Sequence, residues 1–302
     1  MDPYPDIVEP YGYREEPQRS LRGDTVFALS HIRALPSGTR IPLIRAVREV
    51  PSFRLLGLRL NAITEPELYE ITAEAVEAER TRCVVAHHNV HSVYLYHRDA
   101  KMRAFYERAH YIYADGVPLI YLGRLLGHPL RLEHRSTCAE YVYAFMAKAA
   151  RRGWRVFYLG SRPGVPERGA ELLREKIPDL QIATAHGYFS VDTEENQKVL
   201  ETVNAFQPNV LMVGMSMPRQ EHWILDNLEH IQANVVISVG GCMNYVAGVS
   251  STPPRWMAPV LFQGFYRLLK DPRRLWRRYL LEPWFVLGLA LREWAKRSRI
   301  RG

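Results

Sequence analysis

Short apolar runs alternate with longer amphipathic segments between about residue 53 and residue 250. The short runs hold four or five residues and are rich in β-branched and aromatic side chains, which is typical of buried strands. The longer segments carry apolar residues at helical spacing. This alternation predicts an α/β fold with a mainly parallel sheet flanked by helices. The predicted strands are Cys83–Ala86, Tyr111–Ala114, Arg155–Leu159, Leu180–Thr184, Val210–Val213 and Val235–Val239, and the predicted helices are Glu65–Glu79, Pro118–Leu126, Thr137–Arg152, Val165–Lys176, Thr193–Phe206 and Arg219–Ile231.

Residues 1–50 have a different pattern. They are polar and contain several prolines, and no periodic core face precedes Phe53, although Leu43–Val50 resembles a short helix. We expect a partly disordered extension over residues 1–50, an α/β domain over 51–252 and a C-terminal appendage over 253–302. The N-terminus lacks the basic-then-apolar order of a secretory signal. The apolar run Pro283–Leu291 is far shorter than the roughly 20 residues that span a bilayer, so no transmembrane helix is expected.

The net charge is concentrated at one end of the chain. The 302 residues include 40 Lys and Arg against 32 Asp and Glu, a formal charge of +8, and 47% are hydrophobic, as in globular proteins. Residues 267–302 hold 11 Lys and Arg against 3 Asp and Glu, so the rest of the chain is neutral. Cys83, Cys138 and Cys242 are widely spaced without a CxxC pair, which predicts neither a disulfide framework nor a zinc site and fits a reducing cytosol.

The basic tail interleaves its arginines with aromatic and aliphatic residues. Such a pattern is typical of amphipathic helices on an anionic membrane face. There are two alternatives, nucleic-acid binding and a solvated helix packed on the body. The dense apolar content of the tail argues against nucleic-acid binding. The residues concerned are Arg267, Arg273, Arg274, Arg277 and Arg278 among Phe265, Tyr266, Leu268, Leu269, Leu275, Trp276, Tyr279, Leu280 and Trp284 to Leu291.

Polar and glycine residues follow the predicted strands directly. In open α/β sheets, ligands bind in the crevice outside the carboxyl ends of the strands. Five strand ends carry groups capable of chemistry, which favours an enzyme or a ligand site. They are His87-His88-Asn89, Asp115-Gly116, Gly160 to Gly164, Gly214 to Glu221, and Gly240-Gly241 leading to Asn244.

Two of these strand ends have both a chemical and a structural interpretation. Asp115 at the mouth of the sheet is suited to be a general base, but Asp before Gly is also a common helix cap. In the second, Pro218 begins a helix with Gln220 and Glu221 in its first turn. Such a helix start suits an anion or a uridine and ribose edge, and the alternative is that the two side chains only complement the helix dipole.

The remaining motifs argue mainly against certain sites. The turn Gly160 to Gly164 resembles a phosphate cradle, yet it matches neither GxGxxG nor a P-loop, and a plain tight turn is the alternative. The sequence contains no D-x-D triplet that would hold a metal on a nucleotide diphosphate. If a diphosphate leaves, a cationic group has to take the place of the metal. His87 and His88 follow a strand and point to opposite faces, so together with His91 they favour a pocket or structural role over metal binding.

Nine segments, read in order, resemble the bacterial WecG/TagA/CpsF glycosyltransferases, glycosyltransferase family 26. The resemblance covers about residues 53–280, and its specificity comes from the combination. The segments are LLGLRLNAIT (55–64), HN (88–89), YADG (113–116), GHPL (127–130), FYLGSRPGV (157–165), HGYF (186–189), VGMSMPRQEHW (213–223), SVGGCMNYVAG (238–248) and YRLLKDPRRLWRRY (266–279).

The resemblance implies a Rossmann-like fold of the GT-E type with a helical appendage that reaches the membrane. It implies an inverting, metal-independent and cofactor-free transfer from a UDP-sugar, of the N-acetylmannosamine, uronic acid or glucose type, to a polyprenyl-diphosphate-linked acceptor on the cytoplasmic membrane face. Asp115 is then the catalytic base, and the appendage arginines stabilise the leaving diphosphate. The expected substrate-binding residues are His87, Asn89, Arg135, Gly160, Gly214, Gln220, Glu221, Asn244, Arg267, Arg274 and Arg277.

Several positions depart from the family pattern. His87 replaces a usual Thr, Asn244 replaces an Asp, and Cys138 stands where an acid is common, while Arg131 or Arg135 substitutes for a displaced arginine. Thr252-Pro253-Pro254 and Gln263-Gly264 also differ from the usual residues. These changes suggest a divergent subfamily that makes an exopolysaccharide or capsular polymer. The alternatives are a catalytically lapsed scaffold protein and a nucleotide-sugar oxidoreductase. The absence of a GxGxxG motif argues against the oxidoreductase. The sequence leaves a homo-oligomer open.

Overall fold

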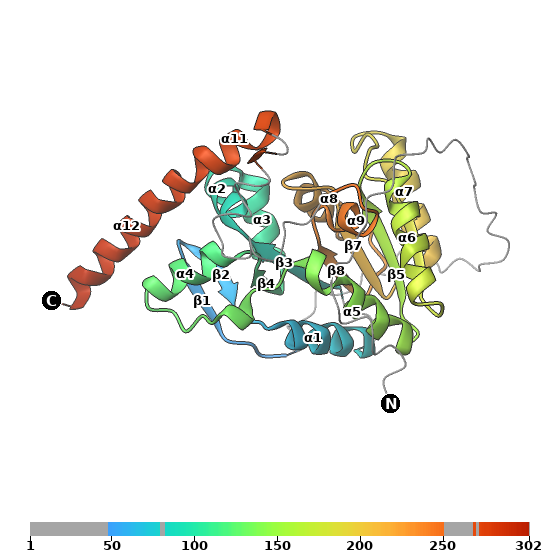
Figure 1. The fold of residues 1–302 in the computed structure, drawn as a ribbon, viewed down its shortest axis with the longest axis horizontal. Coiled ribbons are helices and arrows are strands. Elements are labelled where there is room, and N and C mark those ends of the chain that lie inside the picture. Colours follow the sequence, from blue (N-terminus) through green and yellow to red (C-terminus); the bar gives the residue numbers. More distant parts are fainter. Residues whose placement is uncertain (1–47, 79–81, 251–267, 270–271, 302) are drawn as a thin grey trace.

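A six-stranded parallel sheet forms the centre of the protein (Figure 1). The computed structural model describes residues 48–78, 82–250, 268–269 and 272–301. The strand order is β4-β3-β8-β7-β5-β6, and every neighbouring pair is parallel. The strands are β3 (Cys83–His88), β4 (Tyr111–Ala114), β5 (Arg155–Gly160), β6 (Gln181–Ala185), β7 (Val210–Gly214) and β8 (Val235–Ser238). All six strands predicted from the apolar runs are confirmed.

Helices cover both faces of the sheet, which is why its central strands are apolar over most of their length. Successive strand residues alternate between two cores: Val84 and Ala86 pack in one, and Val85 packs in the other. One face carries α1 (Glu65–Glu77), α5 (Cys138–Arg151), α6 (Val165–Lys176) and α9 (Cys242–Val246). The other carries α2 (Val90–Arg98), α3 (Ala100–Arg108), α4 (Val117–Leu125), α7 (Glu194–Phe206) and α8 (Arg219–Asn227).

A small hairpin lies beside the sheet and was not among the predicted elements. Strands β1 (Ser52–Leu55) and β2 (Leu58–Asn61) pair antiparallel through the two-residue turn Leu56-Gly57. Both turn residues have positive φ, 56° and 82°, which matches the twist of a tight hairpin and explains the glycine. Asn61 accepts a hydrogen bond from the Ile112 N–H at 2.9 Å and so ties the hairpin to the outer strand β4.

Two helices between β3 and β4 were also missed. Asp99 separates them, because its backbone ends α2 and its carboxylate caps α3 by accepting from the Lys101 and Met102 N–H groups. Their mixture of histidine, tyrosine and charge obscured the helical spacing. The six predicted helices are present; Val165–Lys176 has the predicted ends, the others are shifted at one or both ends, and α8 stops at Asn227 rather than Ile231.

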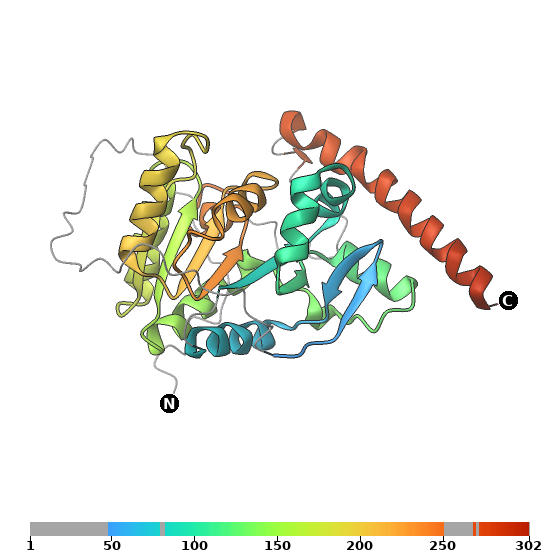
Figure 2. The same ribbon diagram turned by 180° about the vertical axis from the view of Figure 1, so that it is seen from behind.

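The C-terminal helices lie along one end of the molecule, as Figures 1 and 2 show from opposite sides. They are α11 (Pro272–Leu280) and α12 (Glu282–Arg301). Val286 and Ala290 of α12 are buried against the body. Among the described helices, none combines the length and apolar character that crossing a bilayer requires.

Residues 1–47, and with them the predicted disorder and most of the patch Leu43–Val50, lie outside the described part of the chain. The described remainder of that patch, Arg48 to Val50, is not helical. It leads directly into β1, and the Arg48 N–H donates to the Tyr111 hydroxyl at 2.7 Å. A helix reaching Val50 is therefore wrong.

Candidate active site

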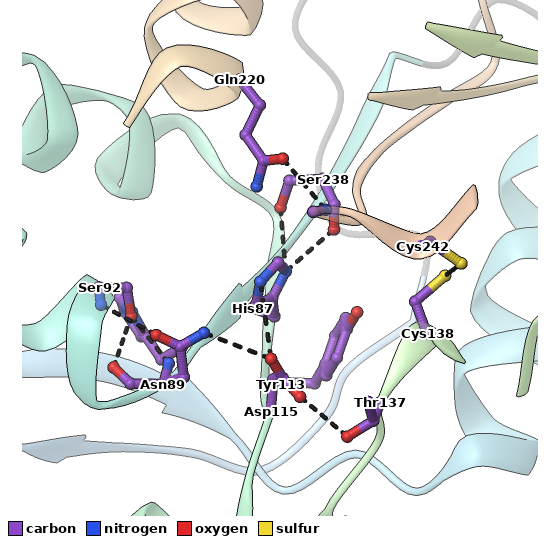
Figure 3. A network of polar contacts seen from close by, with 12 residues as sticks. His87, Asn89, Ser92, Tyr113, Asp115, Thr137, Cys138, Gln220, Ser238 and Cys242 are labelled. Carbon is purple, nitrogen blue, oxygen red and sulfur yellow. Dashed lines mark hydrogen bonds and ion pairs between the residues drawn. The ribbon is translucent and has the colours of Figure 1, made fainter. Parts of the chain in front are cut away.

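Asp115 lies immediately after β4, at the carboxyl edge of the sheet (Figure 3). Its side chain is 28% exposed, so the carboxylate is partly open to solvent. The Thr137 hydroxyl donates to Oδ1 at 2.9 Å, and the Asn89 amide donates to Oδ2 at 3.3 Å. Asn89 is itself fixed as the N-cap of α2 by reciprocal hydrogen bonds with Ser92. The Asp115 carboxylate does not cap helix α4. The N-cap residue of α4 is Gly116, and no side chain makes a capping hydrogen bond there.

His87 faces the same carboxylate from the end of β3. Its Nδ1 donates to the Ser238 carbonyl oxygen at 3.0 Å, which places the proton of the neutral ring on that nitrogen. Its Nε2 lies 3.9 Å from Oδ2 of Asp115. Burial lowers the pKa of His87, and the charge of Arg278 on α11 lowers it further, against the opposing effect of Asp115. A neutral Nε2 and a carboxylate oxygen are both acceptors, so a hydroxyl placed between them donates its single proton to one or the other.

Arg135 reaches Asp115 through Thr137. Its guanidinium binds the Glu140 carboxylate with two hydrogen bonds, and its Nη1 donates to the Thr137 hydroxyl at 3.3 Å. The backbone brings these residues together, since Ser136 N–H donates to the Ala114 carbonyl beside the end of β4. The cation of Arg135 is therefore one hydroxyl away from the carboxylate of Asp115.

Gln220 and Glu221 are fully buried at the start of α8. Gln220 accepts from the Gly240 N–H at 3.1 Å and donates to Glu221 Oε1 at 2.7 Å. Burial raises the pKa of Glu221 to about 7, and its Oε2 has no hydrogen-bond partner. The side chains of Gln220 and Glu221 are therefore hydrogen-bonded to each other, and Gln220 also supports the turn after β8 through Gly240.

The ends of β5 and β7 come so close that only glycine fits at either. A Cβ on Gly160 would collide with the backbone of Gly214. A Cβ on Gly214 would collide with the Tyr158 hydroxyl and the Gly240 carbonyl. Both glycines therefore serve close backbone packing next to the site.

A cavity of about 770 Å³ opens beside these strand ends. Its volume lies within the range of roughly 300–1,000 Å³ that is usual for ligand sites. Of the residues expected to bind substrate, Gly214 and Asn244 line it, together with the cations Arg162 and Arg219. The other lining residues are Ser161, Val165, Gly187, Tyr188, Phe189, Ser190, Glu195, Met215, Ser216, Val249 and Ser250. The cavity thus lies over β5, β6 and β7, whereas Asp115, His87 and Asn89 lie at the ends of β3 and β4.

The appendage arginines are described only in part. Arg267 lies outside the described residues, and the side chain of Arg274 on α11 does as well. Arg277 is exposed on α11, where its guanidinium lies 5.3 Å from the ring of Trp276. Arg278, which the sequence did not single out for the site, is the described arginine whose charge reaches His87.

The histidines after β3 have separate partners. His88 lies 3.0 Å from the Ser92 hydroxyl and stacks near Tyr106, while His91 forms an ion pair at 2.8 Å with Glu282 of α12. Within the described residues, no three His, Cys, Asp or Glu side chains are grouped to hold a metal ion.

Thr137, Ser238 and most of the cavity lining were missed by sequence reasoning. Thr137 was predicted only as the start of a helix, and it is indeed the N-cap of α5. Its position two residues after Arg135 was the available signal. The cavity residues Gly187, Tyr188 and Phe189 after β6 belonged to a noted motif, HGYF (186–189), but had no assigned role.

Comparison with known proteins gives a family match over most of the chain. The family model described as "Glycosyl transferase WecG/TagA/CpsF family" matches residues 53–300. The match includes β1 to β8, the site around Asp115 and both C-terminal helices.

Curated relatives include proteins from two strains of Staphylococcus aureus, MW2 and NCTC 8325 / PS 47. Each bears the name N-acetylglucosaminyldiphosphoundecaprenol N-acetyl-beta-D-mannosaminyltransferase and is 29% identical to this chain over 170 residues. The matched part is 56% of this chain and 65% of each relative, so it spans about two thirds of their length.

Proposed function

This chain belongs to the WecG/TagA/CpsF glycosyltransferase family, and from that premise we propose that it transfers a sugar from a UDP-sugar to a glycan acceptor on a polyprenyl diphosphate. N-acetylmannosamine is the first donor sugar to test and N-acetylglucosamine on the diphosphate the first acceptor, because the relatives' names specify both. The observation that carries the proposal is the Asp115 carboxylate, partly exposed at the sheet edge and held by Thr137 and Asn89.

The proposed reaction is a single displacement with inversion. The acceptor hydroxyl lies between Asp115 Oδ2 and His87 Nε2, and Asp115 takes its proton as the oxygen attacks the anomeric carbon. The new glycosidic bond forms while the bond from the anomeric carbon to the UDP oxygen breaks. UDP departs with the bonding electron pair.

The donor nucleotide occupies the cavity over β5 to β7 in this proposal. Its volume suits a nucleotide, and Arg162 and Arg219 supply positive charge without a metal. Asn244 lines the cavity, while buried Gln220 supports the neighbouring Gly240 turn. In this proposal the appendage arginines Arg267, Arg274 and Arg277 neutralise the leaving diphosphate, and Arg278 of α11 already acts on His87.

The appendage also faces an anionic membrane surface from the cytoplasmic side in this proposal. Trp276, Trp284 and Trp294 are exposed on α11 and α12, at 42%, 71% and 58%. They lie among the basic residues that hold the chain's net charge. Exposed indole rings beside arginines suit the interface of an acidic bilayer, where the acceptor lipid resides.

The decisive test is sugar transfer from UDP-N-acetylmannosamine to N-acetylglucosaminyl-diphosphoundecaprenol. We expect turnover by the wild type, in excess EDTA as well, and a loss of at least about 100-fold in Asp115→Asn, because an amide cannot take the proton. Asp192→Asn, an exposed change before α7, is the matched control and should keep full turnover.

Different failures of this test have different meanings. Full turnover by a folded Asp115→Asn variant would overturn the base assignment. UDP binding by calorimetry without transfer from any UDP-sugar would instead favour the lapsed scaffold protein.

A further inference from the structure

Two buried thiols lie against each other behind the site. The Sγ atoms of Cys138 and Cys242 are 2.8 Å apart, although the residues are 104 positions apart in sequence (Figure 3). Even carbon atoms, which are smaller than sulfur, are optimally about 3.5–4.0 Å apart when not bonded. Both cysteines are free, and each is less than one tenth exposed. This contact joins two segments that the sequence gave no reason to pair.

The contact bridges the two halves of the site. Cys138 is the first residue of α5 and directly follows Thr137, which holds the Asp115 carboxylate. Cys242 is the first residue of α9, and Asn244 two residues later lines the cavity. The pair is therefore a direct side-chain link between the segment that positions Asp115 and the segment that faces the cavity.

The third cysteine provides an internal comparison. Cys83, at the start of β3, is also free and buried. Neither of the other two thiols pairs with it, since the sulfur contact joins Cys138 and Cys242. Burial and thiol chemistry are thus common to all three cysteines, and only the proximity of a second sulfur distinguishes the pair.

We propose that Cys138 and Cys242 form a reversible disulfide when the protein meets a peroxide oxidant, and that this bond slows the enzyme. One thiol is first oxidised by hydrogen peroxide to a sulfenic acid with release of water. The second thiol then displaces hydroxide from that sulfur, and with its proton a second water leaves. In total, two thiols and one peroxide give one disulfide and two waters, and a dithiol reductant reverses the change.

The bond requires only a short movement. A disulfide holds its sulfurs about 2.05 Å apart, so they approach by roughly 0.75 Å from their present separation. That movement pulls the start of α5 and the start of α9 toward each other, and Thr137 and Asn244 move with them. Displacements of about 1 Å around a reacting centre lower turnover by up to about 100-fold. We therefore expect turnover to fall by roughly 10-fold on oxidation and to recover with dithiothreitol.

The bond itself is tested by mass, independently of any activity. After treatment with hydrogen peroxide and before any thiol blocking, the intact protein should lose the mass of two hydrogen atoms, and blocking after denaturation should then add one group, on Cys83. Trypsin without reductant should release the peptide 136–148 linked to the peptide 220–255, with the Cys83 peptide 83–98 unlinked. A linkage through Cys83, or no linkage while the protein stays folded, would overturn the proposal.

Variants separate the bond from general oxidation damage. Cys138→Ala and Cys242→Ala should each abolish the linked peptide and the peroxide-dependent loss of turnover. Cys83→Ala is the matched buried control and should keep both. The linked wild-type peptide decides the pairing if an alanine variant fails to fold.

The predicted loss of turnover rests on the proposed transferase function, whereas the predicted disulfide, which is detected by mass, does not. A disulfide that forms in a protein without transferase activity would count against the function and leave the modification site standing. A disulfide that forms in an active enzyme without changing turnover would overturn its inhibitory effect.

Discussion

The two carboxylate oxygens of Asp115 have different neighbours, and the proposed reaction gives them different roles. Oδ1 accepts from the Thr137 hydroxyl, which in turn accepts from Arg135. Oδ2 accepts a longer bond from Asn89 and faces the His87 ring. Thr137 therefore orients the carboxylate, and in the proposed reaction Oδ2 is the oxygen that takes the acceptor proton.

Removal of the Thr137 hydroxyl should slow transfer without weakening donor binding. In Thr137→Val, which keeps the side-chain shape, we expect kcat to fall about 10- to 100-fold, since hydrogen bonds to charged groups contribute about 1.5–3 kcal/mol. UDP affinity by calorimetry should stay unchanged, and Thr137→Ser should restore most of the turnover. Equal losses in the Val and Ser variants would show that the hydroxyl does not orient Asp115.

Glu221 should make folding stability depend on pH in a defined direction. Its pKa is raised by burial from 4.5 to about 7, so between these values the unfolded chain releases a proton that the folded chain keeps. The unfolded state then binds fewer protons, and the free energy of unfolding falls as pH rises through this window, by about 3 kcal/mol in total.

Glu221→Gln removes this contribution. The free energy of unfolding of each protein is measured by urea titration at pH 4.5 and above pH 7. Between these two pH values the wild type should lose about 3 kcal/mol more than the variant, so the variant becomes more stable relative to the wild type. The exposed Glu171→Gln variant is the control, and its difference should stay within about 1 kcal/mol. A pH-independent difference for Glu221→Gln would contradict the raised pKa.

Helix α12 is docked by polar contacts at both ends of its packed face. Near its start, Glu282 is buried and pairs with His91 of α2. Further along, Glu293 accepts from the Leu56 N–H at 2.7 Å in the β1–β2 turn. The missed hairpin and the missed helix α2 thus form part of the surface that holds α12, together with Leu126 and His128, which Arg297 contacts. Trp284 and Trp294 of α12 are exposed to solvent.

Loss of the exposed tryptophans should weaken binding to acidic membranes. In Trp284→Ser with Trp294→Ser, we expect roughly 10-fold weaker sedimentation with phosphatidylglycerol vesicles, because both rings are apolar surface suited to the bilayer interface. Leu132→Ser, an exposed apolar change outside the appendage, is the control. Wild-type binding should also weaken with salt. Unchanged partitioning of the double variant would contradict the membrane-facing surface.

The sheet brings the Asp115 group and the cavity to one edge, so a nucleotide bound there should stabilise the whole fold. At UDP concentrations about 100-fold above Kd, the free energy of unfolding rises by about 2.7 kcal/mol, which corresponds to roughly 5–10 °C in Tm. Arg162→Gln, which removes a cation from the cavity, should shrink this shift. Arg168→Gln, on the exposed side of α6, should leave it intact, and no shift with UDP in the wild type would argue against the cavity as the donor site.

The sequence by itself determined the six strands of the central sheet, the helices between most of them and the strand ends that carry chemistry. These follow from local pattern: strands covered on both faces are mostly apolar, and polar residues appear where the chain leaves the core. The hairpin β1–β2 escaped because packing against β4 holds it in place, and helices α2 and α3 escaped because their mixture of histidine, tyrosine and charge obscured the helical spacing.

Only the tertiary structure decided which of these strand ends are neighbours. The order β4-β3-β8 puts His87 beside Asp115 and Ser238, while β7-β5-β6 forms the cavity from loops whose residues the sequence left mostly unassigned. It also buried Gln220 and Glu221 and brought Cys138 against Cys242. The physical reason is that a strand's place in the sheet depends on how its two faces pack, and that information is distributed over the whole chain.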